Sequence, residues 1–247
     1  MTTPMNLDLY LDWTGLRGDL AEAAASPSFA QAVRQHQAAL QALLTPEALD
    51  ATPVSWRFRV PELGEGGACS LFGQLAEQPY ELAGILGGQT ADNQRLLAEA
   101  TIVTRYYRER SRSHWFGVYQ ARRKSAEESV LVKLAYFGAE SRAEFPLTEA
   151  FAAGSNNSAV GLSGRARLIN DVAAFVAEGG GYYTCDPKVN AEACLPLFDA
   201  GRRVVGILDS EAFDKDFFDG DELALVVAVA ITLSGGLIAR SGARSGA

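Results

Sequence analysis

Two strand-like runs near the carboxyl end of the chain constrain its fold more than any other feature. The runs, 192–198 and 203–209, are separated by Asp199-Ala200-Gly201, which is typical of a tight turn between antiparallel strands. Successive side chains of a strand point to opposite faces, so Glu192 and Cys194 are predicted to share one face. The chain is therefore expected to build an antiparallel sheet with functional side chains on one side.

Two further pairs of side chains follow the same alternation. Asp209 and Glu211 share a face of the second strand, and Trp115 and Tyr119 share a face of an earlier one. Gly117 lies between the two rings and leaves open space there. If the three faces converge, they form a box with aromatic walls, three carboxylates and a thiol. Such a box suits a small cationic or zwitterionic ligand, because carboxylates hold an ammonium group and ring faces hold a methylated sulfur or nitrogen.

In their order along the chain, these motifs resemble those of the GAF-domain free methionine-(R)-sulfoxide reductases. That family has a Trp-x-Gly-x-Tyr strand, a Cys-Asp loop leading to Glu and Leu-Pro-Leu, a Gly-x-Leu-Asp strand and an acidic helix start. The similar segments here are 115–119, 185–197, 206–211 and 218–222. The resemblance extends over residues 90 to 240, roughly.

The resemblance implies an α/β (α+β) fold with a GAF-like antiparallel sheet flanked by helices, and the residues that precede it are predicted to form a mainly helical N-terminal region. It divides the chain into an N-terminal extension at 1–90, a GAF domain at 91–240 and a flexible tail at 241–247. It also implies a homodimer. The extension has no counterpart in the family, and we interpret it as an annex that covers either the pocket or a dimer surface.

By the same resemblance, Cys185 takes the place of the catalytic cysteine. The substrate-binding positions of the family correspond to Trp115, Tyr119, Glu192, Asp209 and Glu211. The family's other redox cysteines fall in two segments, 143–146 and 157–161, that contain no cysteine here. The second pocket acid, an aspartate in the family, is Glu211 in this chain.

Sulfoxide reduction requires a cysteine thiolate that attacks the sulfur while the oxygen is protonated and leaves as water, giving a sulfenic acid. Three carboxylates in one pocket cannot all stay ionised without a cation, so Glu192 or Glu211 is predicted to supply the proton. Cys194 is the possible resolving thiol, and an external reductant, thioredoxin-like or dithiothreitol, is the alternative. The spacing of Cys185 and Cys194 permits a disulfide without establishing one. No bound cofactor is expected.

Three functions fit these residues. Retention of Cys185 favours a thiol-dependent oxidoreductase that acts on a small free amino-acid-like substrate with a sulfoxide or related oxidised group. A non-catalytic GAF sensory or regulatory domain would bind a small metabolite without turnover, and the missing resolving cysteines and the long annex favour it. A biosynthetic enzyme that reuses the pocket for an N-oxygenated or sulfur-containing amino acid is a third alternative, and fold alone cannot separate them.

Charge, cysteine content and histidine spacing limit which partners, cellular location and metals are expected for this protein. A net charge of -8 argues against nucleic acid, whose backbone is met by clustered Lys and Arg. Three cysteines and the absence of a charged-then-apolar leader at 1–4 indicate a cytoplasmic protein. His36 and His114 are too far apart for a metal motif, so no metal is expected.

The apolar run 223–239 is short for a membrane span, and we interpret it as a buried packing or dimer helix. Cys69 is interpreted as a small buried hydrophobe.

Other segments give ordinary secondary-structure signals. A helix is predicted to begin after Ser26-Pro27, and a longer one to run from Thr90 to about residue 112. Strands 114–120 and 129–137 are predicted to form a hairpin. The segment 154–164 is predicted to be a flexible polar loop whose backbone N–H groups hold a carboxylate.

Overall fold

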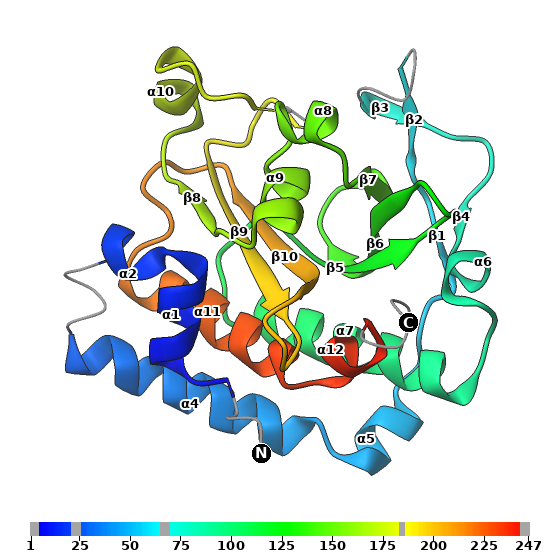
Figure 1. Ribbon diagram of the computed structural model, residues 1–247, viewed down its shortest axis with the longest axis horizontal. Coiled ribbons are helices and arrows are strands. Elements are labelled where there is room, and N and C mark those ends of the chain that lie inside the picture. Colours follow the sequence, from blue (N-terminus) through cyan, green and yellow to red (C-terminus); the bar gives the residue numbers. More distant parts are fainter. Residues whose placement is uncertain (1–4, 21–25, 65–69, 183–185, 243–247) are drawn as a thin grey trace.

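A six-stranded antiparallel sheet lies at the centre of the computed structural model, which describes residues 5–20, 26–64, 70–182 and 186–242 (Figure 1). Its strand order is β7-β6-β5-β10-β9-β8, and every neighbouring pair is antiparallel. The strands are β5 (Trp115–Arg123), β6 (Ser129–Phe137), β7 (Glu144–Pro146), β8 (Arg167–Ile169), β9 (Ala191–Phe198) and β10 (Val204–Ala212). The predicted class, an antiparallel sheet flanked by helices, is confirmed.

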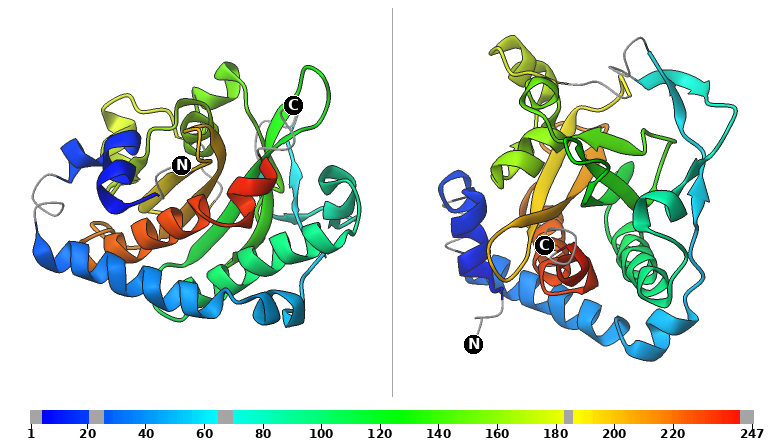
Figure 2. Two further views of the ribbon diagram at one scale, coloured as in Figure 1. Left: turned by 60° about the horizontal axis from the view of Figure 1, so that its bottom comes forward. Right: turned by 45° about the vertical axis from the view of Figure 1, so that its right-hand side comes forward.

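Helices of the N-terminal and C-terminal parts of the chain cover one face of this sheet (Figures 1 and 2). They are α7 (Ala91–Arg108), α11 (Gly220–Ser234) and α12 (Leu237–Gly242), with α4 (Pro27–Leu43) packed against α11. Because α11 lies between α4 and the sheet, it is buried at every position from Glu222 to Ile231. The apolar run 223–239 is thus a buried packing element, divided at Gly235-Gly236. Among the described residues, no helix has the length and apolar character needed to cross a membrane.

The N-terminal region combines helices with short strands. Its further helices are α1 (Leu7–Thr14), α2 (Leu16–Asp19), α5 (Pro46–Ala51) and α6 (Leu82–Leu86). Its strands are β1 (Arg57–Phe58), β2 (Pro61–Leu63), β3 (Ser70–Leu75) and β4 (Tyr80–Glu81), paired as β1-β4 and β2-β3. The helix α4 covers the helical layer and not the opposite face of the sheet. Phe58 of β1 reaches the sheet itself, where its ring packs against Tyr136 of β6.

Three short helices accompany the opposite face: α8 (Glu149–Ala152), α9 (Asn156–Ser163) and α10 (Val172–Ala177). The prediction of a flexible loop at 154–164 is wrong, because this segment forms α9. The Ser155 side chain caps its first turn by accepting a hydrogen bond from the backbone N–H of Ser158, and Gly164 ends it with a positive φ of 67°. Its polar first residues are buried because they face β9 and β10.

Candidate functional site

The predicted strand faces meet in the pairing register of β5, β10 and β9. Glu192 and Glu211 lie opposite each other, as do Cys194 and Asp209. On the other side of β10, Trp115 lies opposite Glu211. The alternation along each strand therefore brings the three carboxylates, the thiol and the rings to one face of the sheet.

This face, together with α9 and the turn after β6, encloses a pocket lined by all five predicted substrate-binding residues. The full lining is Trp115, Tyr119, Ser141, Phe145, Ser155, Asn156, Asn157, Glu192, Asp209 and Glu211. The free volume is only about 20 Å³, enough for about one water molecule. The ring centroids of Trp115 and Tyr119 lie 6.3 Å apart. An amino acid can enter only if lining side chains, such as these rings, move.

The three carboxyl groups form a compact cluster. Glu192 and Asp209 are buried, Glu211 is partly exposed, and one oxygen of each lies within 4.8 Å of the others. Burial raises all three pKa values, that of Glu211 to about 8, and Glu192 also raises those of Asp209 and Glu211. The cluster therefore holds at least one proton at neutral pH. The sequence predicts no metal site, yet these oxygens also lie close enough together to hold a cation.

Two buried asparagines at the start of α9 complete the cluster, and the sequence analysis did not identify them. Asn157 donates from Nδ2 to Asp209 Oδ2 at 3.1 Å and accepts at Oδ1 from Cys194 Sγ at 3.3 Å. Arg167 Nη1 donates to Asn156 Oδ1 at 2.9 Å. Asp209 Oδ1, by contrast, is buried without a hydrogen-bond partner among the described residues. The signal that could have revealed α9 is Ser155, a capping residue directly before the asparagines.

A buried lysine lies behind the aromatic wall, and it too was missed. Lys133 of β6 is fully buried, and its Nζ donates to both the backbone oxygen and Oγ of Ser141 at 2.8 Å. The ammonium lies 3.9 Å from the Tyr136 ring centroid and 6.0 Å from that of Trp115. Although burial and the neighbouring acids raise the pKa of Glu211, Lys133 lowers it. A single lysine inside the apolar strand 129–137 was the available signal.

Of the three cysteines, the structure describes only Cys194. Cys185, the predicted catalytic residue, lies outside the described residues, as do Cys69 and residues 243–247 of the predicted tail. Cys194 is completely buried, and burial together with Asp209 and Glu192 raises its pKa well above the usual range. Its thiol therefore stays protonated, which opposes attack on another sulfur.

The described residues on both sides of Cys185 lie at the carboxylate cluster. Burial raises the pKa of Glu192, and a hydrogen bond from the Tyr182 hydroxyl lowers it. Asp186 lines a second small cavity, of about 40 Å³, that shares Trp115, Ser141 and Glu211 with the pocket. The chain on either side of Cys185 thus contacts the predicted site.

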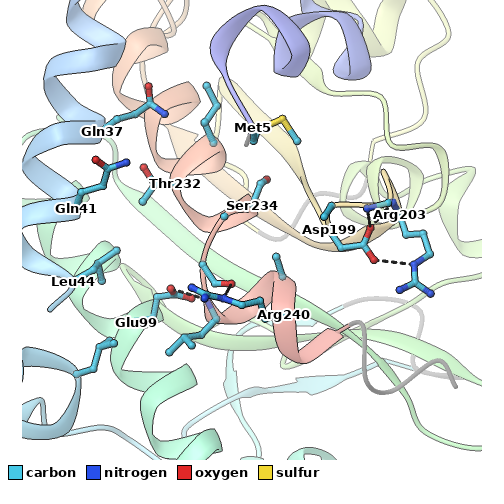
Figure 3. Close-up of a pocket in the computed structure, with 18 of the residues that line it drawn as sticks. Met5, Gln37, Gln41, Leu44, Glu99, Asp199, Arg203, Thr232, Ser234 and Arg240 are labelled. Carbon is cyan, nitrogen blue, oxygen red and sulfur yellow. Dashed lines mark hydrogen bonds and ion pairs between the residues drawn. The ribbon is translucent and has the colours of Figure 1, made fainter. Parts of the chain in front are cut away.

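A larger cavity of about 1290 Å³ lies elsewhere, between α4, the junction of α11 and α12, and the turn from β9 to β10 (Figure 3). Its acids are already paired within the chain. Glu99 accepts from the backbone N–H groups of Leu237 and Ile238 at 2.8 and 3.0 Å. Asp199 accepts from Arg203 Nε at 2.8 Å. In the pocket lined by the three carboxylates, by contrast, Asp209 Oδ1 is buried and has no hydrogen-bond donor in the described part of the chain, so this pocket is the stronger candidate for a polar ligand.

No family model and no curated protein matches this sequence. Among solved structures, the chain is similar to the type II free methionine-R-sulfoxide reductase from Thermoplasma acidophilum, with 18% identity, a TM-score of 0.49, and coverage of 62% of this chain and 96% of that one. For the reduced form of fRMsr of Staphylococcus aureus, the identity is 20%, the TM-score 0.45 and the coverage 57% and 84%.

The chain is also similar to the GAF domain from Acinetobacter phosphoenolpyruvate-protein phosphotransferase, with 15% identity, a TM-score of 0.46, and coverage of 62% of this chain and 87% of that one. The matching structures thus include both reductases and GAF domains, the proteins to which the sequence motifs point. Likenesses of this size concern the arrangement of the chain and carry no argument about activity.

Proposed function

We propose that this protein is a cysteine-dependent oxidoreductase that acts on a small free amino acid bearing a sulfoxide or a related oxidised group. The observation that carries the proposal is the meeting of three carboxylates and two aromatic rings in one small pocket. Carboxylates hold an ammonium group, ring faces hold a methylated sulfur, and the tight enclosure favours a free amino acid over a peptide. The positions of Tyr182 and Asp186 support a role for Cys185, which lies between them in the sequence.

The proposed reaction has two steps. In the first, the Cys185 thiolate attacks the substrate sulfur and forms a sulfur–sulfur bond, while the sulfur–oxygen bond breaks and the protonated oxygen leaves as water. Water then attacks the cysteine sulfur and breaks the sulfur–sulfur bond, so that the net products of the thiol and the sulfoxide are a sulfenic acid and a thioether. In the second, two thiol equivalents of a reductant return the sulfenic acid to the thiol, release one water and form a disulfide. The cysteine carries the oxidising equivalent between the two steps.

Glu192 is the proposed proton donor to the departing oxygen. It is 5% exposed and lies against Asp209, and burial raises the pKa values of both. A proton shared in this buried pair is available at neutral pH, where an ordinary carboxyl would have lost it.

An external thiol, thioredoxin-like or dithiothreitol, is the proposed reductant. Burial and the neighbouring acids raise the pKa of Cys194 and so keep it in its unreactive thiol form. Resolution by Cys194 would require the pocket to open. Cys194 is therefore the second candidate for the reduction of oxidised Cys185.

A sensory role is the second candidate function, and one observation favours it. Phe58, from the N-terminal region, lies 4.8 Å from the Lys133 ammonium and packs on Tyr136, directly behind the wall that contains Trp115. A ring displaced by a ligand would disturb this contact. The N-terminal region could then respond to occupancy without any turnover.

The test is an assay of the reduced protein with free L-methionine-(R)-sulfoxide and dithiothreitol, in which methionine formation is followed. Methionine formed by the wild type and lost in Cys185→Ser would support the reductase. Cys194→Ser, run beside it, should retain turnover with dithiothreitol. Binding measured by calorimetry without any methionine formation would favour the sensor instead.

A further inference from the structure

The side chain of Asn156 is held in one orientation by its neighbour. Asn156 is 4% exposed, and its Oδ1 accepts from Arg167 Nη1 at 2.9 Å. A guanidinium group only donates hydrogen bonds, so the amide oxygen must face Arg167 and the NH₂ group must face away from it. The swapped orientation would set two donors against each other.

The NH₂ group of Asn156 is near Glu192, whose pKa it lowers, but it makes no well-formed hydrogen bond among the described residues. Its Nδ2 is buried, and Asn156 lines the pocket. Asp209 Oδ1, in the same pocket, is buried and likewise makes no well-formed hydrogen bond among the described residues, although the Asp209 carboxyl interacts with that of Glu192. Buried polar atoms are rarely left unpaired. The pocket thus offers whatever fills it one donor and one acceptor that lack well-formed hydrogen bonds within the described chain.

We propose that Asn156 selects the ligand by donating from Nδ2 to the oxygen of its oxidised group, while Asp209 Oδ1 accepts from the ligand's ammonium. This inference rests on the proposed function and names the group that recognises the oxygen. The carboxylate of an amino acid is poorly suited to this position, because Glu192 and Asp209 would repel it. A sulfoxide oxygen is neutral overall and a strong acceptor.

The position of Asn156 in the pocket also agrees with the proposed reaction. Asn156 faces Glu192, so an oxygen held by Nδ2 lies next to the proposed proton donor. A bare divalent cation is a poorer occupant of the pocket. It would satisfy Asp209 Oδ1 but would leave the Asn156 donor without a well-formed hydrogen bond, and Lys133 already lies close to the cluster.

The experiment compares two ligands that differ only in this oxygen. Calorimetry with the full-length Cys185→Ser protein, which should not turn over, gives affinities for L-methionine-(R)-sulfoxide and for L-methionine. Because the ligands share their ammonium and carboxylate groups, the ratio of the two affinities isolates the oxygen contact. We expect the sulfoxide to bind about fivefold more tightly, the effect of one hydrogen bond, and Asn156→Ala to abolish this preference.

Two further variants make the result specific. Asn156→Asp keeps an acceptor for Arg167, so it protects the fold, but it replaces the donor by oxygen and should also remove the preference. Gln41→Ala removes an exposed amide that lines the larger cavity (Figure 3) and should leave both affinities unchanged. An altered affinity in Gln41→Ala would mean that the ligand binds in the larger cavity, which would overturn the inference.

The experiment distinguishes failure of the inference about Asn156 from failure of the proposed function. A preference for the sulfoxide that survives in both Asn156 variants, or equal binding of the two ligands by the parent protein, would overturn the role of Asn156 alone. If the parent protein binds neither ligand, the proposed function fails together with this inference. Displacement of a bound amino acid by Mn²⁺ would also count against the inference, since the carboxylates would then serve a metal ion.

Discussion

Replacing Lys133 by methionine removes the buried ammonium behind the pocket while keeping a side chain of similar length. The change deletes two hydrogen bonds to Ser141 and the cation–π contact with Tyr136 at 3.9 Å. Hydrogen bonds to a charged group contribute about 1.5–3 kcal/mol each. A buried cation–π contact adds about 2 kcal/mol.

Part of this loss is recovered, because the variant no longer buries a charge, which costs several kcal/mol. We therefore expect a net fall of about 2 kcal/mol in the free energy of unfolding. With a urea m-value of about 2–3 kcal/mol/M, the unfolding midpoint should fall by roughly 1 M. The pKa of Glu211, which Lys133 lowers, should rise further.

The assay is equilibrium unfolding in urea followed by tryptophan fluorescence, because Trp115 lies beside the altered position. Lys124→Met is the matched control. Lys124 lies in the same hairpin, is 46% exposed and pairs with Glu144 at 2.8 Å, so its loss should change stability by less than about 0.5 kcal/mol. Equal midpoints for the two variants would refute the view that the Lys133 ammonium supports the pocket wall.

Three other predictions follow from the pocket. Gly117→Ala would place a methyl group against the Trp115 and Tyr119 rings, so calorimetry should record at least about tenfold weaker amino-acid binding; unchanged affinity would show that the rings yield freely. The folded-state pKa of Glu211, about 8, exceeds the unfolded value of about 4.3, so ionisation of this carboxyl opposes folding. The free energy of unfolding measured in urea should therefore fall as pH rises between these two values. A Glu211→Gln variant whose stability depends on pH as steeply as that of the wild type would contradict this. The Cys194 thiol should resist a thiol-specific reagent in the native Cys69→Ser/Cys185→Ser protein and react after unfolding; rapid labelling of the native form would argue that the pocket opens readily.

Local alternation along the chain was enough to predict much of the site. Glu192 and Cys194, Asp209 and Glu211, and Trp115 and Tyr119 were each assigned to one strand face from sequence spacing, and in the structure each pair shares its face. The two-residue period belongs to the backbone of every strand, so it needs no knowledge of the rest of the fold. The turn at Asp199-Ala200-Gly201 was recognisable from its own residues, because such residues are typical of tight turns between antiparallel strands.

Only the tertiary structure decided which polar residues outside the strand motifs join the site. Asn156 and Asn157 looked like loop residues because their segment is short and polar, and their burial depends on α9 packing against β9 and β10. Lys133 is held by Ser141 and Tyr136, which are near it in the sequence, and by the Phe58 ring of β1, which is separated from it by more of the chain than any local pattern spans. A sequence period identifies the face on which a side chain lies. Long-range packing determines what that face meets, and therefore which buried groups are left to bind a ligand.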